Sequence, residues 1–66
     1  MNALVSIITP SYNSAKFIAE TIYSVQNQTY PNWEMIIVDD GSSDDTEDVV
    51  LSIIQNDNRI QFHKLS

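Results

Sequence analysis

The feature that most constrains this chain is an apolar run that leads straight into a group of acids. The run covers residues 35–38 and is followed by Asp39, Asp40 and the chain's one glycine, Gly41. Apolar runs of this kind are typical of strands buried on both faces, as in a parallel sheet covered by helices. Such strands present functional groups at their carboxyl ends. The two acids therefore mark either a ligand site or the polar end of an ordinary turn.

The segments around this run predict alternating strands and helices. Residues 4–9 read as a strand that Pro10 should end, because proline cannot donate to a central ladder. Residues 33–38 form the second strand and residues 59–64 a third. The order β-α-β-α-β with short turns predicts an α/β fold, a Rossmann-like parallel sheet with crossover helices.

The two helices are expected between these strands. Ser14 is a suitable N-cap for a helix that runs to about Gln28. The second helix should begin within residues 42–45. Asp44 and Glu47 are spaced like a capping box there. Acids at that helix start leave no room for a phosphate, whereas the start of the first helix carries no acid and could face an anion.

In such a sheet the carboxyl ends of the first two strands become neighbours, at the edge where open α/β sheets bind ligands. Tyr12 and Asp40 would then face each other. An ionised carboxylate only accepts hydrogen bonds, so Asp40 could pair with the ring N–H of uracil or with guanine, while a base stacks on Tyr12. Alternatively, Asp40 closes the turn with Gly41 and Tyr12 packs on a helix. Asp39 points to the opposite face and is expected to be structural.

Composition excludes several functions. The net charge is −6, and eight of the nine acids lie in residues 34–57, which hold no Lys or Arg. That surface is unsuited to nucleic acid and would repel a nucleotide diphosphate unless a cation lay between them. There is no cysteine and no apolar run near the length of a membrane span, so we expect one cytoplasmic domain. The spacings of a P-loop, a GxGxxG loop and an EF-hand are missing.

Three blocks of this chain together resemble the N-terminus of family 2 glycosyltransferases. They are VSIITPSYN at residues 5–13, SVQNQTY at 24–30 and WEMIIVDDGSSDDT at 33–46. The resemblance implies a GT-A fold and transfer of a sugar from a nucleotide-sugar donor to a glycan acceptor, with inversion at the anomeric carbon. It implies that Pro10 and Tyr12 line the base pocket and that Asp40 bonds the base, most often uracil. We assign Ser11 and Asn13 only shaping roles in this loop.

One part of the family pattern is missing from this chain. The family's D-x-D motif, which holds Mg²⁺ or Mn²⁺ on the diphosphate, lies beyond the third strand, and the general base lies further still. No D-x-D spacing occurs in residues 1–66, so no catalytic residue and no metal ligand is assigned. We therefore expect a partial nucleotide-sugar-binding domain, inactive alone. Its parent enzyme would make glycan or cell-envelope polysaccharide in the cytoplasm, at the inner face of the membrane in some cases.

Two other classes remain open at this point. A response-regulator receiver also gathers aspartates around Mg²⁺, but it carries its acidic pair after the first strand, where this chain has Thr9-Pro10. A non-enzymatic α/β interaction domain is the other alternative. Because an unpaired strand edge offers free N–H and C=O groups to another strand, we expect the chain to associate with itself through the exposed edge of its sheet.

Overall fold

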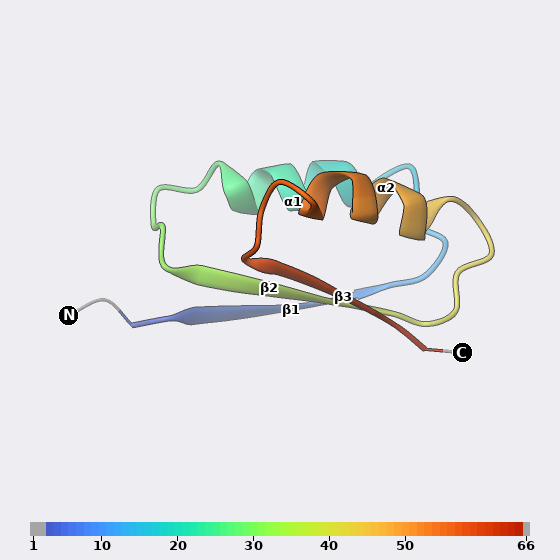
Figure 1. Cartoon of the computed structure of the whole chain (residues 1–66), viewed down its shortest axis with the longest axis horizontal. Coiled ribbons are helices and arrows are strands. Elements are labelled where there is room, and N and C mark those ends of the chain that lie inside the picture. The colour runs from blue at the N-terminus through green and yellow to red at the C-terminus, as the bar shows by residue number, and fades with distance from the viewer. Residues whose placement is uncertain (1–2, 66) are drawn as a thin grey trace.

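The computed structural model describes residues 3–65, and it confirms the predicted β-α-β-α-β order. Figure 1 shows these elements, which are β1 (Val5–Ser11), α1 (Ile18–Gln26), β2 (Trp33–Asp39), α2 (Thr46–Ile54) and β3 (Ile60–Lys64). The three strands are parallel, and β2 lies between β1 and β3. Both helices have nine residues. No helix within residues 3–65 is long and apolar enough to cross a membrane.

The two helices cover the same face of the sheet, as Figure 1 shows. The strand order advances in one direction, β1-β2-β3, and right-handed crossovers then place both connections on one side. Along β2, every second residue from Trp33 to Asp39 is buried under the helices, while Ile36 and Val38 on the other face are half-buried. The prediction that β2 is buried on both faces was therefore wrong within residues 3–65.

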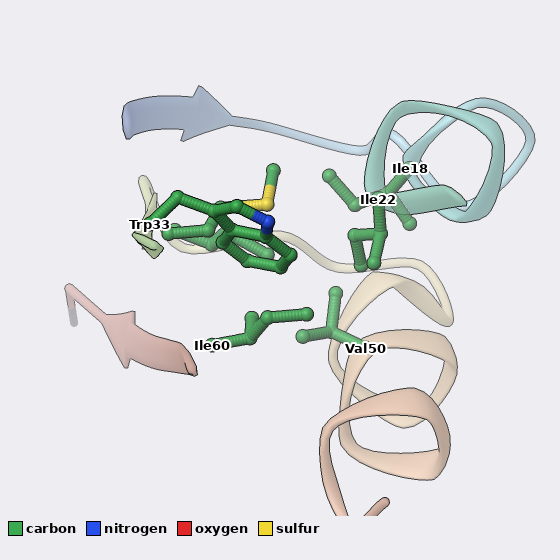
Figure 2. Close-up of a cluster of buried hydrophobic side chains, with 7 residues drawn as sticks. Ile18, Ile22, Trp33, Val50 and Ile60 are labelled. Carbon is green, nitrogen blue, oxygen red and sulfur yellow. The ribbon is translucent and has the colours of Figure 1, made fainter. Parts of the chain in front are cut away.

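The hydrophobic core lies between the helices and the covered face of the sheet (Figure 2). Trp33 is 2% exposed, and Met35, Ile37 and Val50 are fully buried beside it. As a set, the core consists of one residue from β3, three from β2 and three from the helices: Ile60, Trp33, Met35, Ile37, Ile18, Ile22 and Val50. Ile18 and Ile22, one helical turn apart on α1, and Val50 of α2 therefore supply the helical side of this layer.

Pro10 does not end the first strand, which continues to Ser11. Pro10 pairs in register with Val38 of β2. The N–H of Val5 and the carbonyl of Ser11 both bond toward the second-strand side, so the alternation of the strand turns the nitrogen of Pro10 to the free edge. A missing N–H removes no ladder bond there, which is why proline is tolerated on edge strands.

The first helix begins later than predicted, whereas the N-cap residue of α2, Asp45, lies at the end of the range predicted for its start. Helix α1 starts at Ile18 with Phe17 as its N-cap residue, and no side chain caps it. Ser14 contributes its backbone carbonyl, which accepts the N–H groups of Phe17 and Ile18, while its hydroxyl bonds the carbonyl of Tyr12. The N-cap prediction for Ser14 was therefore wrong. The same holds for the end of the helix, which is Gln26 rather than Gln28.

A polar cluster fixes the entry to β3, at the edge of the sheet opposite the strand carboxyl ends. The Arg59 guanidinium donates to both carboxylate oxygens of Asp57, at 3.0 and 2.9 Å, and stacks 3.8 Å from the centre of the Trp33 ring. Gln26 donates to the same carboxylate at 3.1 Å. The hydrogen bonds from Arg59 outweigh burial and lower the pKa of Asp57 from 3.8 to about 2. The cluster ties β3 to α1 and β2.

Candidate functional site

The carboxyl ends of β1 and β2 meet, as the sequence predicts. Ser11 and Asp39 are partners in the parallel register, and the N–H of Asp40 donates to the Ser11 carbonyl at 2.9 Å. This bond extends the ladder by one position beyond the second strand. The loops that follow the two strands, residues 12–17 and 40–45, therefore leave the sheet side by side.

An open hollow of about 540 Å³ lies at this junction. The three residues predicted as the site, Pro10, Tyr12 and Asp40, all line it. The Tyr12 side chain does not pack under a helix, since Tyr12 is 60% exposed, and Asp40 is exposed as well. The structure thus brings the three residues together, and their role in binding a base remains a prediction. The other lining residues are Ser11, Ser14, Val38 and Leu65.

Asp39 is fully buried behind the hollow and is held by three donors. Its Oδ1 accepts from the hydroxyls of Ser11 at 2.7 Å and Ser42 at 2.5 Å, and its Oδ2 accepts the Ser42 N–H at 2.8 Å. Burial by itself would raise the pKa of Asp39. The bonds from Ser42 and Ser11, with the charge of Lys64, outweigh it and lower the pKa. Asp39 is therefore a charged structural residue that links the two strand ends.

Asn13 carries the connection from the first loop to the second. Its N–H donates to the Ser42 hydroxyl at 2.8 Å, and its side-chain oxygen accepts the N–H groups of Ser43 at 2.8 Å and Asp44 at 3.3 Å. The backbone of Asn13 is left-handed, with φ of 48°. Gly41 in the second loop also has positive φ, 76°, and a Cβ there would lie 3.3 Å from the Leu65 carbonyl oxygen. That close approach explains why the chain's one glycine stands at this turn.

Asp44 closes the junction on its other side. Its carboxylate accepts the N–H and hydroxyl of Thr46, and the N–H of Ala15 at 3.2 Å. These bonds, led by the Thr46 hydroxyl, lower the pKa of Asp44. The predicted capping box with Glu47 was wrong, because Glu47 pairs with Lys64 at 3.3 Å and the helix begins only at Thr46.

The start of the first helix is not an open anion site. The N–H of Ser14 donates to the Thr46 hydroxyl at 2.8 Å, and the N–H of Ala15 donates to Asp44. A carboxylate from the second loop thus occupies the position at which the sequence predicted a possible anion. The phosphates of a ligand would have to be held by other groups.

The acids at this junction do not fit a metal ion. Both oxygens of Asp39 already accept from protein donors, and those of Asp44 accept from Thr46 and Ala15. Over residues 3–65, no three His, Cys, Asp or Glu side chains converge to hold a metal. The part of the chain that the structure describes therefore offers Asp40 as a hydrogen-bond acceptor and not as one of a ligand set.

Sequence reasoning missed several residues that shape the hollow. Leu65 follows β3 and reaches the hollow because β3 runs parallel to β2 and ends at the same edge, with Lys64 opposite Asp39. Two hydroxyls connect the loops. The Ser42 hydroxyl accepts the N–H of Asn13 and donates to Asp39. The Thr46 hydroxyl accepts the N–H of Ser14 and donates to Asp44. The sequence does show the hydroxyl side chains of Ser42 and Thr46. Their partners in the first loop, however, lie 29 and 32 positions away along the chain, so local patterns do not reveal the pairing.

Comparison with known proteins gives consistent matches. Residues 6–66 match the model of Glycosyl transferase family 2. The chain is 52% identical over 59 residues to the UDP-Glc:alpha-D-GlcNAc-diphosphoundecaprenol beta-1,3-glucosyltransferase WfgD of Escherichia coli. That match covers 89% of this chain and 22% of WfgD. The chain spans about a fifth of the length of the curated relatives that it matches first, from 20% to 23%.

The fold also matches solved structures. A crystal structure of residues 1–349 of TarS from S. aureus superposes with a TM-score of 0.85 at 33% identity, over 97% of this chain and 19% of that one. The mannosyltransferase PcManGT of Pyrobaculum calidifontis, solved with GDP-Man and Mn²⁺, gives 0.78 at 28% identity, over 92% and 18%. These neighbours are GT-A glycosyltransferases, so the α/β fold class predicted from the sequence is confirmed.

Proposed function

We propose, because this chain belongs to glycosyltransferase family 2, that its first two strand ends bind the base of a nucleotide-sugar donor. The observation that carries the proposal is the pairing of exposed Tyr12 and Asp40 at the rim of one hollow, with Pro10 beside them. A donor base stacks on the Tyr12 ring while the Asp40 carboxylate accepts its ring N–H.

Uracil is the base we assign, in the form of a UDP-sugar. The relative WfgD is named for a UDP-Glc donor, whereas PcManGT was solved with GDP-Man. Uracil and guanine both offer a ring N–H to a carboxylate, whereas adenine and cytosine offer only an exocyclic amino group on that edge. Asp40 therefore accounts for selection of uracil or guanine, and the family resemblance favours uracil.

We assign the remaining chemistry to parts of the longer family proteins that this chain does not cover. Mg²⁺ or Mn²⁺ on the diphosphate would be held there, in keeping with the Mn²⁺ of PcManGT, and so would the base that activates the acceptor. The whole protein would transfer a sugar with inversion to a glycan acceptor, in cell-envelope polysaccharide synthesis. We place it in the cytoplasm or at the inner face of the membrane, since the acceptor in the name of WfgD is a diphosphoundecaprenol. Residues 1–66 alone should not transfer sugar.

A second candidate, an interaction module, is favoured by the uncovered face of the sheet. Ile8 of the edge strand β1 is 61% exposed there, next to half-buried Ile36. Apolar residues on an exposed strand edge promote pairing with another chain. The register pair Pro10 and Val38, two positions further along the same face, lines the hollow, so this surface adjoins the proposed nucleotide site.

A nucleotide titration tests the proposed function. The ¹⁵N-labelled chain is titrated with UDP, UMP, GDP and ADP while the amides around Tyr12 and Asp40 are followed. We expect weak binding that is tighter for the two uridine nucleotides and localised to the two strand ends. Equal shifts with all four nucleotides, or no shifts, would contradict the proposal, and tighter binding of GDP would change the assigned base to guanine.

A further inference from the structure

We infer that Asn13 is a positioning residue that fixes the separation of Tyr12 and Asp40 and thereby sets the affinity and base preference of the site. This inference rests on the proposed function, since it concerns the same pair of residues. Asn13 does not line the hollow, so it acts through the loops that carry the pair.

The two exposed residues have few contacts that could place them. The Tyr12 backbone bonds only locally to the Ser14 hydroxyl, with its N–H at 3.3 Å and its carbonyl at 3.1 Å, among the described contacts. Asp40 donates its N–H to the Ser11 carbonyl, but its side chain stands in the open. Their relative position therefore depends on the residues next to them in each loop.

Those flanking residues are bonded across the junction. Ser11, before Tyr12, is tied to Asp39, which precedes Asp40. Asn13, after Tyr12, is tied by its N–H to Ser42. Each exposed residue is thus held between two cross-loop attachments, and Asn13 makes the attachment on the far side of Tyr12.

Asn13 makes this attachment with two separate properties. Its left-handed φ of 48° turns the chain directly after Tyr12, a conformation that asparagine tolerates far better than most residues. Its Oδ1 then reaches the N–H groups of Ser43 and Asp44 in the second loop. In addition, the N–H of Asn13 donates to the Ser42 hydroxyl, which in turn donates to the buried carboxylate of Asp39. These two bonds form one hydrogen-bonded chain between the loops.

Two substitutions separate these properties. Asn13→Gly keeps the left-handed turn accessible but removes the oxygen that accepts from Ser43 and Asp44. Asn13→Asp keeps both the oxygen and tolerance of the turn, with an added charge. If the side-chain oxygen positions Tyr12 against Asp40, only the glycine variant should lose nucleotide affinity and base preference.

The first measurement needs no nucleotide. In the folded chain, the amide of Ser43 should be protected from hydrogen exchange in the wild type and in Asn13→Asp, and unprotected in Asn13→Gly. Protection that survives in Asn13→Gly would overturn the inference whether or not nucleotides bind, because the acceptor would then not hold the second loop.

The second measurement is UMP and AMP affinity of the folded variants, with folding checked by amide dispersion. We expect Asn13→Gly to bind UMP about tenfold more weakly, the effect of losing two modest hydrogen bonds, and to lose most of its preference over AMP. Asn13→Asp should stay within about threefold of wild type, since a carboxylate oxygen accepts the same two N–H groups. Unchanged affinity and preference in folded Asn13→Gly would overturn the inference alone. A wild-type chain that binds no uridine nucleotide would overturn the proposed function and this inference with it.

Discussion

The hydroxyl of Ser11 donates to the carboxylate of Asp39 at 2.7 Å, joining residues 28 positions apart where β1 and β2 end. The carboxylate is fully buried, and its other contacts are to Ser42 of the following loop. The buried Asp39 carboxylate therefore links the end of β2 to the end of β1 and to the loop that carries Asp40.

Asp39→Asn should destabilise the chain strongly. The new amide group would turn a donor toward groups that are themselves donors, which leaves buried polar atoms unpaired. We expect a loss of about 2–3 kcal/mol in the free energy of unfolding. Urea unfolding followed by the fluorescence of Trp33, the chain's one tryptophan, measures it. The exposed neighbour is the control, since Asp40→Asn should change stability by less than about 0.5 kcal/mol. Equal effects of the two changes would contradict the structural role of Asp39.

Stability should fall in acid through Asp57. Its pKa is about 2 in the folded chain, below the ordinary 3.8, because Arg59 bonds the charged form. A lowered folded pKa means that the contribution is complete above about pH 4 and is lost as the pH falls toward 2. The loss should amount to about 2 kcal/mol. Urea midpoints between pH 2 and 7 test this, and Asp57→Asn should remove that part of the acid dependence. An unchanged pH profile in the variant would show that Asp57 does not carry it.

Ile8→Lys should reduce self-association. Ile8 is 61% exposed on the uncovered face of the edge strand, so a lysine there adds charge to the surface without disturbing the core. Charged residues on an edge strand oppose pairing with another chain. We expect wild-type sedimentation to depend on concentration and the variant to remain monomeric. A wild-type chain that is monomeric at every concentration would contradict the prediction. The control is Ser52→Lys on the exposed side of α2, which should leave association unchanged.

The order of the elements and the meeting of the strand ends could be predicted from the sequence because both follow from local patterns. Apolar runs mark the strands, and parallel crossovers bring Ser11 and Asp39 to one edge. The grouping of Tyr12 and Asp40 followed from the same topology, and the resemblance to family 2 glycosyltransferases added Pro10 to them.

What the sequence did not reveal depends on non-local partners. Helix α1 begins later than predicted, and the N–H groups of Ser14 and Ala15 bond Thr46 and Asp44 of the other loop instead of a local cap. Pro10 fits a strand only because β1 lies at the edge of the sheet. The open face of β2 follows from the strand order, which the pattern of residues 35–38 does not encode.

The affinity of UDP for the wild type, Asp40→Asn and Asp45→Asn tests the central claim most directly. Both variants lose one negative charge, but Asp45 lies at the start of α2, makes no side-chain cap and does not line the hollow. We predict that Asp40→Asn weakens UDP binding at least about tenfold, the effect of losing a hydrogen bond to a charged acceptor, while Asp45→Asn binds like the wild type. Unchanged binding in Asp40→Asn, or an equal change in both variants, would contradict the assignment of Asp40 as the residue that reads the base.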